Sequence, residues 1–336
     1  MVHPFFVLGN TDATFFSFFF VISKKVHIFA NRYMSLSSSN KTMTGFPTER
    51  YINPYTDFGF KKLFGTEMNK DLLISFLNAL FNGHEVIRDV TYLNGEHFGE
   101  SYRDRKAIFD VYCENEQGEK FIVEMQKAEQ DYFKDRSIYY ATFPIREQAP
   151  RGDWNFQLKG VYTVGILNFV FPEDEYSPTC YHHEVKLMDT EDKHVFYDKL
   201  TFVYIEMPKF NKTEDELVTM FDKWLFVLRN LSRLMERPAA LQERIFTKLF
   251  EQAEIARFTP QDAKEYEESI KIYRDLTNVV NTAERKGREV GREEEKIATV
   301  RRLHSLGISV DQIAQGTELT VAQVQYILFE EQNKEE

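Results

Sequence analysis

The sequence predicts an α/β protein in which a mixed sheet flanked by helices is followed by an all-helical C-terminal extension. Strand-like segments with alternating or continuous apolar residues recur between residues 86 and 207. A helical pattern at residues 129–147 divides them, which is typical of a sheet whose strands are linked through helices. From residue 213 onward, apolar side chains recur at helical spacing.

The composition is that of a globular protein with enough residues for a large core. The 336 residues are 43% hydrophobic and 28% charged, which favours more than one domain. The formal net charge of −11 argues against a generally basic nucleic-acid binder, but a bound metal can supply local positive charge to a nuclease. Two cysteines, Cys113 and Cys180, are too few for a disulfide framework and suit a cytoplasmic protein.

Residues 1–45 differ in character from the rest of the chain. The apolar run at residues 15–22 is shorter than the roughly 20 residues that span a bilayer. We expect a mis-called or disordered leader, with the true start at Met34 or Met43. A real membrane anchor is the alternative; otherwise no membrane contact is expected.

Two helices and a strand are expected before the central hairpin. Thr56 or Asp57 caps a short first helix, and the second helix covers residues 69–81. Residues 86–93 form a strand. The polar loop at residues 94–104 then lies where it could approach a substrate.

A β-hairpin organises the centre of the chain. Residues 107–114 and 120–126 are rich in strand-forming side chains, and turn residues separate them. Folding the chain about a three-residue loop at 116–118 pairs Asn115 with Glu119.

Counting back from that pair places Asp110 opposite Glu124, where Cβ atoms lie roughly 4.5–5.5 Å apart. Two carboxylates that close on a buried sheet face are costly without a proton or a cation. A hard divalent metal is the usual solution, so we expect Mg²⁺, with Mn²⁺ as a substitute, at this pair. The alternative is an ordinary hairpin whose acids face solvent.

The order of several motifs resembles a known family. An Asp before a turn, followed by an apolar strand that ends Glu-x-Gln, resembles the PD-(D/E)XK nuclease motif. More narrowly, the chain resembles the Rpn family of recombination-promoting nucleases and transposases. The segments that carry this resemblance are residues 57–64, 108–111, 123–126 and 136–140. It covers roughly residues 51–209 and implies a restriction-endonuclease-like domain over residues 46–210.

The resemblance implies a metal-dependent DNA endonuclease linked to recombination or transposition in the bacterial cytoplasm. Asp110 and Glu124 would hold the metal, and Gln126 would orient the attacking water. Gln126 stands where the general motif has Lys, a form that recurs in this family, and an amide is neither a cation nor a base. The alternative is a catalytically weakened nuclease-like domain that binds DNA or a protein partner without cutting.

Four further side chains are candidates for the border of this site. The resemblance places Asp57 or Lys61 beside it, although a helix cap and a solvated helix face explain both residues equally well. Arg136 and Tyr140 lie one helical turn apart and project together. Arg136 would contact a phosphate if its helix flanks the site, and otherwise it faces solvent or a nearby acid.

The remaining strands follow this helix. Residues 159–169 form a nearly continuous apolar run, as in a buried central strand. Further strands are expected at residues 181–188 and 200–207, with a connection at 193–199. The adjacent His182 and His183 would point to opposite faces of a strand and therefore do not predict a shared metal.

Residues 211–283 are expected to be a helical extension. A capping box at residues 213–216 opens a helix that runs to about residue 235. Its apolar stripe contains aromatic residues and indicates core packing rather than a cofactor site. Pro238 and Pro260 begin two further helices, the second of which reaches Thr282.

Residues 284–336 form a charged hinge and a small tail. Residues 284–296 predict a solvated helix or a hinge, weakened by two glycines. Two more capping boxes, at Ser309 and Thr320, open short helices that resemble a helix-turn-helix. The second helix carries no Arg or Lys over residues 321–328, which favours packing or homo-oligomerisation over DNA reading. An interaction protein built on the helical half is a third functional alternative.

Overall fold

The computed structural model describes residues 49–83, 86–97, 107–150, 152–172, 177 and 179–332. Six strands form one mixed sheet in the order β1-β4-β5-β6-β8-β7. The strands are β1 (Val90–Tyr92), β4 (Val111–Asn115), β5 (Lys120–Gln126), β6 (Val161–Leu167), β7 (His182–Met188) and β8 (Val195–Glu206). The three central strands β5, β6 and β8 are parallel, and the outer pairs are antiparallel.

The apolar run at residues 159–169 becomes the central strand β6, in which every residue is buried. The predicted connection at 193–199 is wrong, because β8 already begins at Val195. The first half of β8 pairs with the edge strand β7 and is mostly exposed, so it needs no apolar pattern. The predicted first hairpin strand is broken before Val111 into β4 and the short β3 (Ala107–Ile108).

A separate two-stranded sheet pairs β2 (Glu96–His97) with β3. Strand β2 lies near the start of residues 94–104, which were expected to be a polar loop. Residues 98–104 of that loop, and the whole leader at residues 1–45, lie outside the residues that the structure describes.

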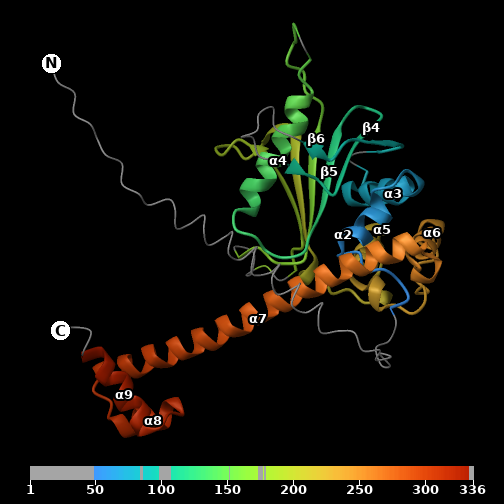
Figure 1. The fold of residues 1–336 in the computed structure, drawn as a ribbon. Helices are drawn as coiled ribbons and strands as arrows, with labels where there is room; N and C mark the ends of the chain where they lie inside the picture. The colour runs from blue at the N-terminus through green and yellow to red at the C-terminus, as the bar shows by residue number, and fades with distance from the viewer. Residues whose placement is uncertain are drawn as a thin grey trace, which may run out of the picture. The chain divides into compact units, whose positions relative to one another are not determined.

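Helices cover both faces of the large sheet (Figure 1). Helix α4 (Phe133–Glu147) packs on one face through Phe133 and Ala141. The other face is covered by α2 (Asp57–Phe64), α3 (Lys70–Phe81), α5 (Met220–Asn230) and α6 (Arg244–Ala253). Trp224 of α5 is fully buried against the rings of Phe64, Phe76 and Phe246, so the predicted aromatic stripe is core.

The helical half departs from the prediction at two starting points. The capping box at Thr213 opens only a 3₁₀ turn, Glu214–Glu216, and not the predicted α-helix. Helix α5 starts later because Thr219 forms its own capping box with Asp222. The helix expected at Pro238 starts instead at Arg244. Other 3₁₀ turns are Glu67–Asn69, Met207–Lys209, Leu231–Arg233 and Ile255–Arg257.

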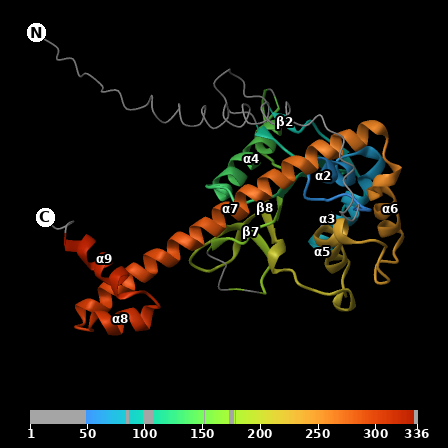
Figure 2. The same cartoon turned by 60° about the horizontal axis from the view of Figure 1, so that its bottom comes forward.

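Helix α7 spans Pro260–Ser305 without interruption (Figure 2). Residues 284–296 are therefore the solvated helix of the two alternatives, and α7 extends well beyond Thr282. The ion pair Arg285–Glu289 at 3.0 Å and a second one between Arg288 and Glu284 support the helix across its glycines.

The C-terminal helices are α8 (Val310–Thr317) and α9 (Val321–Gln332). They enclose a small core with the end of α7, made of Val300, Ile313, Ala314, Val324 and Ile327. Val321 was expected in this core but is 40% exposed, because it opens α9 and faces away from the cluster. Among the described residues, none of the helices combines the length and apolar character that a bilayer crossing requires.

Candidate active site

The predicted hairpin register is confirmed. The backbone N–H of Asn115 donates to the carbonyl of Glu119 at 3.0 Å, and Val111 pairs with Val123. The same register places Asp110, one residue before β4, opposite Glu124 of β5. The Asp110 side chain stays on the strand pair because its Oδ2 accepts a hydrogen bond from the Met125 N–H at 3.0 Å.

A pocket of about 200 Å³ lies at the end of β5, between the start of α2 and the middle of α4. It brings together six of the seven predicted site residues, namely Asp57, Asp110, Glu124, Gln126, Arg136 and Tyr140. Lys61 is not in this pocket. It pairs with Asp57 at 3.0 Å and lines the neighbouring cavity of about 580 Å³, which Asp57 and Asp110 also border.

Burial disfavours ionisation of the two facing carboxylates. Burial and, to a smaller extent, the nearby Asp110 raise the pKa of Glu124 to about 8, against the opposing effect of Arg136. Burial also raises the pKa of Asp110, against the hydrogen bond from Met125. Among the described residues, neither carboxylate has an ion-pair partner within 4.0 Å. The pair therefore carries an electrostatic cost that a cation would relieve.

Gln126 is held by two partners. Arg136 Nη2 donates to its side-chain carbonyl Oε1 at 2.6 Å, and its own Nε2 donates to the carbonyl of Ala128 at 3.0 Å. Arg136 also bonds Gln130, and its guanidinium lies 5.7 Å from the ring centroid of Tyr140. The guanidinium is thus committed to Gln126 in this state, although its buried Nε has no hydrogen-bond partner within the described part of the chain.

The donor set suits a hard divalent cation. Asp110 and Glu124 offer carboxylate oxygens from adjacent strands in a partly open pocket, which is the ligand chemistry that Mg²⁺ prefers. No group of three or more His, Cys, Asp or Glu side chains that could hold a metal occurs in the described residues. A metal held here would have these two carboxylates as its protein ligands, and other oxygen ligands would complete its shell.

Two polar residues of the pocket were not predicted as site residues from the sequence. Lys127 follows the Glu-x-Gln motif directly and lines the pocket. A basic residue just after the end of the motif strand was the available signal. Thr56 also lines it, but its hydroxyl caps α2 by accepting from Gly59 N at 2.9 Å, and it was expected only as a cap.

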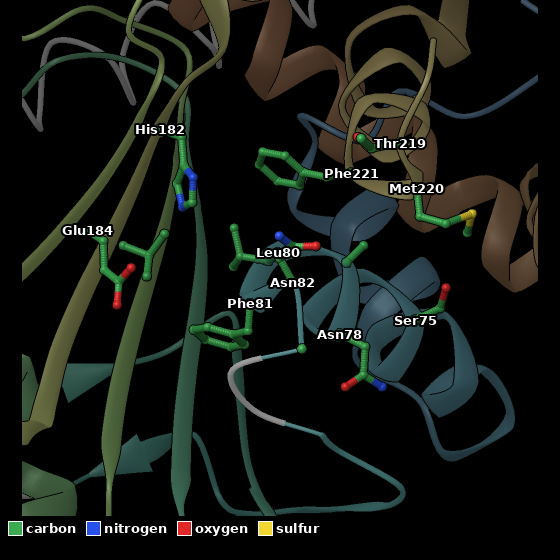
Figure 3. Close-up of a pocket in the computed structure, with 13 residues that line it drawn as sticks. Ser75, Asn78, Leu80, Phe81, Asn82, His182, Glu184, Thr219, Met220 and Phe221 are labelled. Atoms are coloured by element: carbon green, nitrogen blue, oxygen red, sulfur yellow. The ribbon is translucent and has the colours of Figure 1, made fainter.

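A larger cavity of about 780 Å³ lies elsewhere, between α3, β7 and the start of α5. Figure 3 shows His182 and Glu184 on the β7 side and Phe221 on the α5 side. Several polar groups there are already satisfied, since Asn78 exchanges two hydrogen bonds with Ile87. This cavity contains none of the predicted site residues. His183 contacts Glu206 at 3.2 Å, so the two histidines do not share one site.

Comparison with known proteins points to the same region. Residues 54–283 match the family described as PD-(D/E)XK nuclease family transposase, which is more than half of the chain. The match reaches past residue 209 and includes α5, α6 and the first half of α7. Searches of curated proteins and of solved structures returned no match. The match and the six-stranded sheet flanked by helices confirm the predicted restriction-endonuclease-like fold.

Proposed function

Because the chain belongs to the PD-(D/E)XK nuclease family of transposases, we propose that it is a metal-dependent endonuclease that hydrolyses phosphodiester bonds of DNA. The observation that carries the proposal is the opposed pair Asp110 and Glu124, which share one pocket and have no ion-pair partner within 4.0 Å among the described residues. The link to transposition or recombination rests on the family description.

In this proposal Asp110 and Glu124 hold Mg²⁺, for which Mn²⁺ can substitute. A bound divalent cation supplies activation of water and neutralisation of charge on the phosphate. Gln126 uses one amide hydrogen on Ala128 and keeps the other to orient a water molecule. Arg136 fixes that amide, and the Lys127 ammonium attracts the DNA backbone to the pocket.

A plasmid-nicking assay tests this function. We expect nicking by the wild type with Mg²⁺ and none with EDTA. Asp110→Asn and Glu124→Gln should each lower the rate by about 100-fold or more, as expected for the loss of an electrostatic group in the site. Asp153→Asn, at an exposed aspartate outside the pocket, is the matched control and should leave the rate unchanged.

A second function is favoured by one specific observation. Gln126 replaces the Lys of the general motif, and its amide is tied to Arg136 and Ala128. A domain that binds DNA without cutting would retain DNA in a gel-shift assay and give no nicking with Mg²⁺ or Mn²⁺. That pair of results would replace the first proposal with this one.

A further inference from the structure

A further cavity, of about 400 Å³, lies beside the candidate active site. It is lined by Asn53, Tyr55, Asn168, Arg229, Arg233 and Tyr273, together with other residues. We propose that this cavity binds a backbone phosphate of the DNA strand whose scissile phosphate occupies the pocket of Asp110 and Glu124. The inference rests on the proposed function and adds to it the path of the substrate.

The cavity and the pocket share two walls. Asn168, which follows β6, donates from its N–H to the carbonyl of Gln126 at 2.9 Å and from Nδ2 to that of Lys127 at 3.3 Å. On the other wall, the Thr56 hydroxyl donates to the carbonyl of Asn53 at 2.7 Å. Gln126, Lys127 and Thr56 line the pocket, whereas Asn168 and Asn53 line the cavity. Because directly bonded residues separate the pocket from the cavity, one ligand can occupy both.

Two arginines give the cavity its charge. Arg229 is fixed by Nη1, which donates to the carbonyl of Met207 at 2.7 Å and also to that of Phe210. Its Nη2 has no hydrogen-bond partner in the described part of the chain. The side chain of Arg233 is exposed and likewise forms no hydrogen bond or ion pair with the described residues. An anchored guanidinium beside an uncommitted one is suited to bind a phosphate through several N–H groups.

The opposing charge in the cavity is small. Glu49 is the one carboxylate among the described residues that line it. Its oxygens are engaged by the Tyr266 hydroxyl at 3.2 Å and by Arg274 at 3.6 Å. The cavity thus keeps a net positive charge in a chain whose formal net charge is −11, so an anionic strand is drawn to this place in particular.

The other side of the active site repels a polyanion. The neighbouring cavity between α2 and α7 is lined by Asp262, Glu265 and Glu268. Lys62 neutralises only Asp262 there, at 3.0 Å. A strand that leaves the scissile position is therefore directed along the ends of β5, β6 and β8, toward the arginines. Two steps between neighbouring strands cover about 10 Å, which equals the rise of about three base pairs along the axis of B-form DNA.

The test compares Arg233→Gln with Arg244→Gln, an exposed arginine of α6 that lines neither cavity. Arg229 is not replaced, because it also holds backbone carbonyls. The first measurement is the Kd for a fluorescent DNA duplex by anisotropy in EDTA over a range of KCl concentrations. The second is the KM and kcat of nicking with Mg²⁺.

We expect Arg233→Gln to raise Kd and KM about tenfold with kcat unchanged. The slope of log K against log [KCl] should become less negative by about 0.9, as for one lost phosphate contact. Arg233→Lys should restore the slope, and Arg244→Gln should match the wild type. A merely structural role for Arg233 would not change the salt slope.

The outcomes separate this inference from the proposed function. If the wild type cuts and Arg233→Gln equals the Arg244→Gln control, the inference is overturned while the nuclease function stands. If the wild type binds DNA without cutting and Arg233→Gln makes the salt slope less negative, the phosphate site stands and the nuclease function falls. If the wild type neither binds nor cuts DNA, both are wrong.

Discussion

The guanidinium of Arg136 donates to the side-chain carbonyl of Gln126 at 2.6 Å, and this bond connects α4 to the last residue of β5. It explains how the chain can carry an amide where the general motif has Lys. The positive charge near the carboxylate pair comes from a neighbouring helix instead, where it opposes the raised pKa of Glu124. Gln126 and Arg136 therefore act as one unit.

Restoring the Lys of the motif should harm this protein. Gln126→Lys would place an ammonium against the Arg136 guanidinium and remove its acceptor, so we expect the free energy of unfolding to fall by about 1–3 kcal/mol and nicking to weaken. Urea denaturation and the nicking rate measure both effects. Gln126→Lys combined with Arg136→Gln should recover stability, because it exchanges the two groups; no recovery would show that the pair is not coupled.

Removing one carboxylate should separate metal binding from stability. Asp110→Asn keeps an oxygen for the Met125 N–H but removes the repulsion with Glu124, so the metal-free protein should become more stable by on the order of 1 kcal/mol. Mg²⁺ should raise the melting temperature of the wild type by mass action and leave this variant almost unchanged. Thermal melts of the wild type and Asp110→Asn with and without Mg²⁺ measure these shifts in melting temperature. Equal shifts in both proteins would contradict a metal site at this pair.

The stability of the metal-free protein should depend on the protonation of Glu124. Its folded-state pKa of about 8 lies above the ordinary value of 4.5, so the folded state binds more protons than the unfolded state between these values. This contribution to stability is present at pH 5, declines as the pH rises toward 8, and is constant above that. Because the pocket is partly open, solvent screening reduces this effect, and we expect a loss on the order of 2 kcal/mol.

Glu124→Gln is the variant that checks this pH dependence. It cannot ionise, so its unfolding free energy in EDTA should be flatter than that of the wild type from pH 5 to pH 8. Glu251→Gln, at an exposed position on α6, should keep the wild-type profile. Parallel profiles for all three proteins would mean that Glu124 ionises normally in the folded state.

Glu206 at the end of β8 should be important for stability. It is fully buried, accepts from the Phe171 N–H at 2.6 Å and lies 2.6 Å from the ammonium of Lys209. Glu206→Gln removes the carboxylate from this buried ion pair, which should cost about 3–5 kcal/mol. Glu184→Gln, which breaks the exposed pair with Lys186, should cost less than about 1 kcal/mol. Urea midpoints that are equal in the two variants would be inconsistent with a buried ion pair.

Removal of residues 297–336 should leave nicking unchanged. The small core around Val300 and Ile313 shares no residue with the large core or with the active-site pocket. The measurement is the nicking rate of the shortened protein, with circular dichroism to verify its fold. Loss of nicking in a folded protein would mean that the tail completes the site or holds an essential dimer.

The sequence was informative wherever the determinants were local. Asn115 and Gly118 specify the turn, the turn specifies the register, and the register brings Asp110 to Glu124. The start of α5 was not predictable in this way, because the capping boxes at Thr213 and Thr219 are both formed and only tertiary packing decides which one opens a helix. The Arg229–Arg233 cavity was missed for a similar reason.

That cavity lies between α5 with its following turn and the ends of strands that are distant in the sequence. A local sequence pattern does not predict contacts of this kind. The length of α7 was underestimated because two glycines suggested a break. Each glycine costs about 1 kcal/mol relative to Ala, and the ion pairs of Arg285 and Arg288 offset part of that cost.

The tight turn of the hairpin also determines which side chains of the two strands face each other in the candidate active site. Asn115 Oδ1 accepts from the N–H groups of Gln117 at 3.1 Å and Glu119 at 2.9 Å, and Gly118 adopts φ +79°. Insertion of a single residue here would shift one strand by one position and turn Asp110 away from Glu124, although both carboxylates would remain in the chain. Among relatives of this protein, loop length at this turn should therefore distinguish active enzymes from inactive ones even where every acidic residue is kept.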